Sequence, residues 1–329
     1  MPHISAIGKY LDQPLLTAKI NKNIPAVLTI GSSAVFLKEI NNAPENKRKK
    51  TAIKTGIILA STGISAIKAP QIAAYLTKRQ NAKTITELKT YNTELIDNYL
   101  AKNKVVENIK QILTKAKTKI LSLKEINELF NSKEHKAFAN QIIPPPENIK
   151  AKDIFKEIGW LSIYGAIPVA GGLTGGVIAD KLTEKNWKDR IPNKINEGLY
   201  QYLANIFLCN IGAGAALGIL EKMNIKSKSA RCAGMVGGIL LTGVIGGSAI
   251  ANFIANKFVN PLMSKNHKTD TRTPELLDLG LHTDDIATVS LLSGLKWIEP
   301  SLPLLYSISG YRAGIGYRNH NHKNQPDKK

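Results

Sequence analysis

Hydrophobic positions form three long uncharged stretches in the second half of the chain. They run over Ile158–Ala179, Gly198–Leu220 and Cys232–Asn256. At about 1.5 Å of rise per helical residue, each is about 33–38 Å long, and a hydrocarbon layer of about 30 Å could be crossed by any of them. Charged residues close each stretch, and aromatic residues lie near several ends, where amphipathic rings prefer the membrane interface. The pattern predicts three transmembrane helices.

Small residues recur at four-residue spacing inside these stretches. The third contains two such rows, Gly234–Gly238–Thr242–Gly246 and Gly243–Gly247–Ala251–Ala255. Small-residue rows let helix backbones approach closely in lipid. The rows are explained either by packing among the spans of one chain or by a self-assembling pore. The expected helix-packing residues are Gly171, Gly172, Gly175, Gly176, Gly214, Gly218, Gly234, Gly238, Gly243, Gly246 and Gly247.

Two shorter apolar runs precede the long ones, at Ile24–Leu37 and Thr55–Ile67. Both fall short of the roughly 20 residues that a spanning helix needs. They suit a hairpin of membrane-embedded or interfacial helices, and a soluble helix pair is the alternative. Pro70 follows the second run, and we expect it to interrupt or kink a continuing helix.

Residues 77–140 are rich in Lys, Glu and Asn, with apolar residues at helical spacing. Two capping boxes, Thr84 with Glu87 and Ser122 with Glu125, predict helix starts. The second start near Leu123 favours two or three packed helices over one unbroken coiled coil. The region is either a small domain that packs against itself or a surface for oligomers and partners.

The expected fold class is all-α: a multi-pass membrane protein with a Gly-rich transmembrane bundle and a basic helical polar region. The predicted organisation is as follows: an N-terminal segment with two short apolar helices over 1–76, a basic amphipathic region over 77–143, a Pro-rich hinge over 144–152, the Gly-rich core over 153–262, an irregular helical segment over 263–312 and a disordered basic tail over 313–329.

The net charge of +20 indicates an anionic partner. Lipid is favoured over nucleic acid, because the chain combines apparent membrane spans with only 6% aromatic residues. The expected anionic-lipid contacts are Lys47, Arg48, Lys49 and Lys50. The basic stretch 77–156 predicts a cytoplasmic N-terminal region by the positive-inside rule. The loop 181–196 would then lie outside, although it is also basic.

Few polar residues occur at positions suited to membrane chemistry. Asn210 lies at mid-span, where an amide packs against other helices or lines a permeation path. Lys296 and Glu299 form an i, i+3 charge pair, which marks either an interfacial turn or a broken transporter helix.

Sequence patterns for catalysis are missing: there is no Walker loop, G-x-S-x-G elbow or H-E-x-x-H motif. We expect no enzyme activity, cofactor or metal. The predicted function is a non-catalytic protein of a bacterial inner membrane that assembles or scaffolds through its Gly-rich helices, alone or with a membrane-protein partner. The alternative is a small-solute or ion transporter using Asn210, Lys296 and Glu299.

Overall fold

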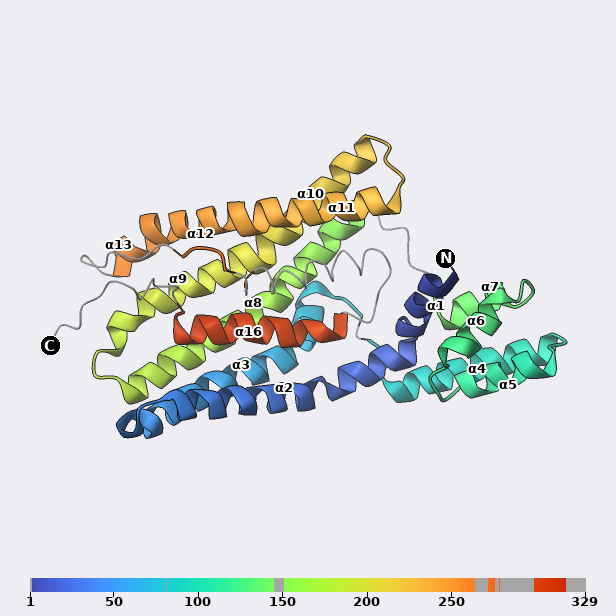
Figure 1. The fold of residues 1–329 in the computed structure, drawn as a ribbon, viewed down its shortest axis with the longest axis horizontal. Helices are drawn as coiled ribbons and strands as arrows, with labels where there is room; N and C mark the ends of the chain where they lie inside the picture. The colour runs from blue at the N-terminus through green and yellow to red at the C-terminus, as the bar shows by residue number, and fades with distance from the viewer. Residues whose placement is uncertain are drawn as a thin grey trace. The chain divides into compact units, whose positions relative to one another are not determined.

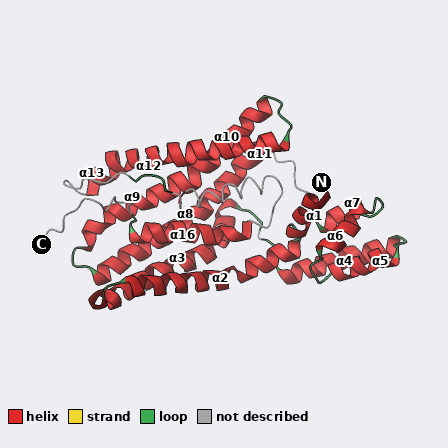
Figure 2. Cartoon of the chain, in the orientation of Figure 1, coloured by secondary structure: helices red, strands yellow, loops and turns green. Residues whose placement is uncertain are grey.

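The computed structural model describes residues 2–80, 82–144, 151–263, 272–275, 278 and 299–317. These residues are nearly all helical and contain no strand, so the predicted all-α fold is confirmed (Figure 2). They form two compact units. The first takes the described residues of Met1–Ile24, Gln80–Ile149 and Ala287–Leu302, and the second takes those of Pro25–Arg79, Lys150–Ile286 and Pro303–Lys329.

The first unit is a group of short helices. Its helices are α1 (Pro2–Leu11), the start of α2 (Pro14–Asn42), α4 (Ile85–Lys102), α5 (Glu107–Ala116), α6 (Leu123–Asn131) and α7 (Lys136–Ile142) (Figure 1). Both predicted capping boxes are present: the Thr84 and Ser122 side chains accept from the backbone N–H groups of Glu87 and Glu125, whose side chains bond back. The predicted helix start at Leu123 is therefore confirmed.

The first unit packs around its own apolar core. Ile96, Leu113 and Leu129 lie at its centre. The ring of Tyr99 stacks on that of Phe138 with 3.7 Å between centroids. The side chains at helical spacing in the sequence thus meet within one small helical domain, which is the simpler of the two interpretations of residues 77–140.

The second unit is a bundle of long helices. Its elements are the rest of α2, η1 (Glu45–Lys47), α3 (Arg48–Thr77), α8 (Ala151–Thr183), η2 (Trp187–Arg190), α9 (Ile191–Tyr202), η3 (Leu203–Phe207), α10 (Leu208–Lys222), α11 (Lys228–Ile239), η4 (Leu240–Gly247), α12 (Ser248–Ile254), η5 (Ala255–Val259), α13 (Asn260–Met263) and α16 (Leu302–Ile315), which follows η6 (Glu299–Ser301).

Four helical stretches of this unit are long and apolar enough to cross a membrane: Glu45–Thr77, Glu157–Thr183, Trp187–Lys222 and Ala230–Met263. Three contain the stretches predicted to span. The fourth contains the shorter run Thr55–Ile67. Its helix, α3, continues through Pro70 to Thr77, so the helix is longer than its uncharged run indicated.

Helix α8 carries two neighbouring glycine rows, and each row faces a different helix. A methyl group on Gly171 or Gly175 would overlap Ser65 or Ser61 of α3. On the other row, methyl groups on Gly172 and Gly176 would overlap the backbone of α16 at its two interior glycines, Gly310 and Gly314. Glycine thus lets two helices approach α8 closely, and Figure 1 shows α3 and α16 running along it.

Helix α10 uses glycine in the same way. Gly212 lies against Gly238 of α11, where neither position has room for a side chain. A methyl group on Gly214 would lie 3.2 Å from the side chain of Ile158, at the start of α8, and one on Gly218 would lie 3.7 Å from Ala151. Both central helices therefore meet two neighbours through small residues.

The last predicted span is interrupted by two π-helical segments, η4 and η5. The residues that meet α10, η3 and α9 include Gly238, Thr242, Gly247, Ala251 and Asn260, with buried Ala255 between the last two. The steps between them are four residues, except for five-residue steps at Thr242–Gly247 and Ala255–Asn260, which coincide with η4 and η5. A π-helical turn adds one residue to the helical repeat, so each such segment restores the inward face.

The register shift separates the two glycine rows predicted in this span. Gly234 lies against Leu220, Gly243 is buried, and Gly247 lies against Ala204. A methyl group on Gly246 would meet only the Leu241 carbonyl of its own helix. Gly246 therefore does not continue the face that begins at Gly234 and Gly238.

Candidate functional site

The apolar runs of several helices in the second unit stop where charged residues meet each other inside the bundle. Lys54 precedes the apolar run of α3, and Asp180 follows that of α8. Their side chains pair at 2.6 Å. Glu197 precedes the run of α9 and α10, Arg312 follows that of α16, and their side chains lie 3.7 Å apart. One level of the bundle is therefore a layer of paired charges.

Asp278 receives the densest set of contacts in this layer. Arg272 donates from Nη2 to both of its carboxylate oxygens, at 2.9 and 2.8 Å, and Arg312 Nη1 donates at 2.9 Å. The backbone N–H of Glu275 donates at 2.9 Å. Arg272 and Asp278 are each only 1% exposed. Hydrogen bonds between guanidinium groups and a carboxylate are charge-assisted and are among the strongest in proteins.

Two further carboxylates balance the guanidinium groups. Glu197 is fully buried and lies 3.4 Å from Arg272 Nε. Glu275 accepts from Arg312 Nη2 at 3.2 Å and from the Tyr317 hydroxyl at 3.0 Å. Each guanidinium group therefore bridges carboxylates from different parts of the chain, which ties α9, the segment 272–278 and α16 together.

Aromatic rings complete the surroundings of the guanidinium groups. Arg272 lies 4.5 Å from the ring centroid of Tyr200, and Arg312 lies 4.4 Å from that of Tyr317. Burial alone would lower the pKa of Arg272, but the carboxylates of Glu197 and Asp278 outweigh it, so this pKa is raised. Arg272 is therefore a fixed positive charge of the layer.

A smaller ion cluster adjoins the first. Lys194 lies one helical turn before Glu197, and its ammonium group pairs with Asp180 at 3.1 Å and donates to the Gly314 carbonyl. Taken together, the described layer holds four basic and four acidic side chains, which makes it neutral: Lys54, Lys194, Arg272, Arg312, Asp180, Glu197, Glu275 and Asp278.

A chain of hydrogen-bonded side chains runs along α9 and η3 beside the layer, and its last member, Asn205, also donates to Asp278 at 3.5 Å. Gln201 Nε2 donates to Glu197 Oε1 at 2.8 Å, and Asn205 Nδ2 donates to Gln201 Oε1 at 2.9 Å. The three residues follow each other at four-residue spacing, and Asn205 lies in the π-helical segment η3. Polar groups at such depth mark candidate pathways for protons or ions as well as structural contacts.

The segment that carries Arg272 is anchored by its backbone. The Asn252 side chain donates to the Arg272 carbonyl at 2.8 Å and accepts from the Arg272 N–H at 2.9 Å. The Ser248 hydroxyl donates to the same carbonyl at 3.3 Å. Helix α12 therefore holds the segment in position through side chains that replace the missing regular backbone partners.

Of the polar residues predicted as a membrane site, Asn210 is the one whose side chain the structure describes. Asn210 is buried, and its amide donates to the Ile206 carbonyl of its own helix at 2.5 Å. Lys296 lies outside the described residues, and Glu299 is described only as the first backbone position of η6. Lys47, Arg48, Lys49 and Lys50 are exposed where η1 leads into α3.

Sequence reasoning assigned no site role to the residues of the charge layer. Asp180 and Glu197 marked the ends of apolar runs, and Arg312 was placed just before a disordered tail. In the structure, α16 continues through Arg312 to Ile315. The available signal was that charges end the apolar runs of several helices, which suggests a common level in the membrane.

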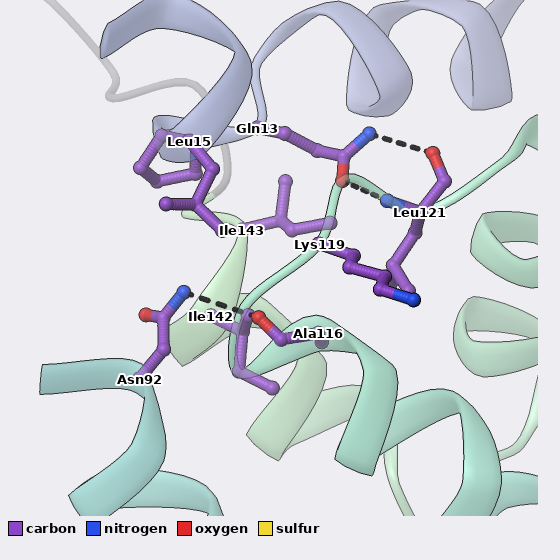
Figure 3. Close-up of a pocket in the computed structure, with 9 residues that line it drawn as sticks. Gln13, Leu15, Asn92, Ala116, Lys119, Leu121, Ile142 and Ile143 are labelled. Atoms are coloured by element: carbon purple, nitrogen blue, oxygen red, sulfur yellow. Dashed lines mark hydrogen bonds between the residues drawn. The ribbon is translucent and has the colours of Figure 1, made fainter. Parts of the chain in front are cut away.

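The first unit contains a small cavity between α2, α4 and α5 (Figure 3). Its volume of about 10 Å³ suits a single water molecule and excludes a metabolite. Gln13 spans one wall, donating to the Leu121 carbonyl at 3.0 Å and accepting from its N–H at 2.7 Å. The cavity is therefore part of the packing of this unit.

No group of His, Cys, Asp and Glu side chains within the described residues is arranged to hold a metal ion. Comparison with known proteins found no matching protein family, no matching curated protein and no matching solved structure. The function is therefore inferred from the chemistry of the described side chains.

Proposed function

We propose that this chain is a non-catalytic, multi-pass protein of a bacterial inner membrane, with a self-packed transmembrane anchor that serves as a scaffold. The observation that carries the proposal is the distribution of polarity in the second unit. Charged side chains such as Glu197 and Arg272 are buried in pairs, while Leu241 and Ile245 are 64% and 65% exposed. Such an arrangement matches lipid as the surrounding solvent.

The glycine rows pack against helices of the same chain, which supports a scaffold whose transmembrane part assembles within one chain. Rows on α8 and α10 are covered by helices of the same chain. Gly237 meets nothing within 4 Å, so it lies on the outer face together with Leu241 and Ile245. Self-association or binding of a membrane-protein partner would use this outer face and leave the internal rows in place.

Crosslinking of the full chain in native membranes tests the scaffold role. We expect covalent adducts with another protein or a second copy, and we expect Gly237→Leu to reduce them without changing the melting temperature. Gly238→Leu is the matched comparison, because it should unfold the bundle. If crosslinking in native membranes gives no covalent adducts, the scaffold role is contradicted.

Transport is a second candidate, and the chain Glu197–Gln201–Asn205 favours it. Three hydrogen-bonded polar side chains lie in a row along α9 and η3, inside the bundle and beside the charge layer. In a transporter these residues would replace the predicted set of Asn210, Lys296 and Glu299 as the first candidates. Proton or cation flux in proteoliposomes that is lost in Asn205→Leu, with folding preserved, would favour transport over the scaffold role.

A further inference from the structure

We infer that one end of the transmembrane bundle is a docking surface for anionic phospholipid headgroups and therefore faces the cytoplasmic leaflet. We call this surface the basic rim. It consists of Lys47, Arg48, Lys49, Lys181, Lys185 and Lys188, all exposed or partly exposed. The inference rests on the proposed membrane location and adds to it a lipid class and an orientation.

Two turns far apart in the sequence form the basic rim. One joins α2 to α3, and the other joins α8 to α9. Lys50 pairs with Glu184 at 2.6 Å, and Arg190 pairs with the same carboxylate at 3.2 Å. One turn of helix further in, Lys54 pairs with Asp180. Glu184 and Asp180 are thus paired with inner basic residues, and the six residues of the basic rim share the surface with the exposed acids Glu45 and Asp189.

The charge at this end exceeds that of the short loop at the other end. Residues 45–54 and 180–194 together hold more basic than acidic side chains, and most of the surplus belongs to the basic rim. The loop between α10 and α11, over 221–231, is shorter and carries fewer basic residues. The positive-inside rule also counts basic residues within about 15–20 positions of a span, so Lys78, Arg79, Lys150, Lys152 and Lys156 count for the other end. The assignment of the basic rim to the anionic cytoplasmic leaflet therefore rests on the clustering of its charge in two adjoining turns.

The basic rim lies at headgroup depth. Lys181 follows Asp180, where the apolar run of α8 ends, and Lys47 precedes Thr55 by eight residues, or about 12 Å of helix. Trp187 lies in the turn between α8 and α9 with Lys188 5.9 Å from its ring centroid. Trp prefers the membrane interface, and basic side chains beside it reach the phosphates.

The orientation differs from the one expected from sequence. That expectation placed residues 77–156 in the cytoplasm. Helix α3 instead lies antiparallel along α8, with Lys50–Glu184 at one end and Arg79–Glu157 at the other. Arg79 and Glu157 therefore lie at the end of the bundle opposite the basic rim.

Lipid titration tests the docking surface. The full chain in neutral detergent is titrated with phosphatidylglycerol or phosphatidylcholine, and bound lipid is counted by native mass spectrometry. We expect the protein to bind phosphatidylglycerol in preference to phosphatidylcholine. In the double variant Lys185→Gln with Lys188→Gln, binding of phosphatidylglycerol should weaken about fivefold for each lysine removed. Lys222→Gln with Lys226→Gln, at the other end, is the matched control. Equal effects of the two double variants would overturn the docking surface.

Cysteine labelling tests the orientation. The native cysteines are replaced by Cys209→Ala and Cys232→Ala, and then Asn186→Cys or Asn224→Cys is added. In intact cells, an impermeant maleimide should label position 224 and spare position 186. The reverse pattern would overturn this inference and leave the membrane location intact. Removal of the protein from membranes by alkaline carbonate would instead contradict the proposed function itself.

Discussion

Gly172 of α8 and Gly310 of α16 lie backbone against backbone, so that a methyl group on either would overlap the main chain of the other helix. Gly176 and Gly314 repeat the contact one turn further along. Since no side chain separates the helices, the packing of α16 depends on the absence of Cβ atoms at these positions. The contact also places Arg312, between the two α16 glycines, inside the charge layer.

Gly310→Ala should destabilise the bundle. The new methyl group would meet the Pro168 carbonyl, and overpacking of this kind costs about 1–3 kcal/mol. Gly63→Ala, in α3, is the matched control, because nothing lies within 4 Å of its Cβ position. Thermal unfolding in detergent measures both. A similar midpoint for the two variants would show that the close contact is unimportant.

Arg312→Met should be among the most damaging single changes. It leaves Asp278 and Glu275 without one of their guanidinium partners, and breaking a buried ion pair costs about 3–5 kcal/mol. Arg48→Met, at an exposed position, should cost less than about 0.5 kcal/mol. The free energy of unfolding in mixed micelles is the measurement.

Arg312→Met with Asp278→Leu should cost less than the two single changes added together. The double change removes one charge of each sign and leaves Arg272 paired with Glu197. Coupled residues of this kind show interaction energies of about 0.5–3 kcal/mol. Strict additivity of the unfolding free energies would mean that the two side chains do not act as a pair.

Gln13→Glu should loosen the first unit. The amide both donates to and accepts from the backbone of Leu121, and a carboxylate cannot donate to the carbonyl. An unsatisfied buried carbonyl costs about 1–3 kcal/mol. We expect faster hydrogen exchange at the Leu121 amide in the full chain. Gln71→Glu, at an exposed position of α3, should leave that rate unchanged.

The first unit should lose stability in acid through Glu125. Burial would raise the pKa of this carboxyl, but the bonds from Lys115 and Ser122 outweigh it and lower the pKa from 4.5 to about 2. Because the folded pKa is the lower one, the stabilisation is complete above about pH 4.5 and is lost as pH falls through about 2.

Glu125→Gln should therefore flatten the acid dependence in that window. Hydrogen exchange of α5 and α6 in the full chain, corrected for the intrinsic effect of pH, is the measurement. Glu94→Gln removes a carboxylate from an exposed position of α4 and should keep the wild-type dependence. An unaltered pH profile in Glu125→Gln would show that another group controls acid stability.

Local sequence patterns predicted the parts of the fold that depend on neighbours in the chain. The capping box formed by Ser122 and Glu125 is four residues long and specifies the start of its helix. The length of the uncharged stretch is enough to identify the apolar part of α8. Pro70 does not end α3, because packing of α3 along α8 offsets the backbone hydrogen bond that proline removes.

The charge layer could not be predicted from local patterns, because its partners are distant in sequence. Glu197 meets Arg272 and Arg312 only after α9 and α16 have packed. The spacing of the glycines also does not show that Gly171 packs against α3 while Gly172 packs against α16. Such assignments depend on the rotation of each helix, which a single sequence leaves undetermined.

The π-helical segment η4 holds one residue more than an ordinary α-helix needs between Thr242 and Gly247. Deleting one residue there would leave the four-residue step of a regular helix, so the residues that follow would keep their face and Asn252 would still reach the backbone of Arg272. Deleting Val177 from the uninterrupted helix α8 would instead rotate everything after it by about 100° and turn Asp180 away from Lys194. Deletion of Val244 should therefore be far less harmful than deletion of Val177, because only the π-helical segment has a residue to spare.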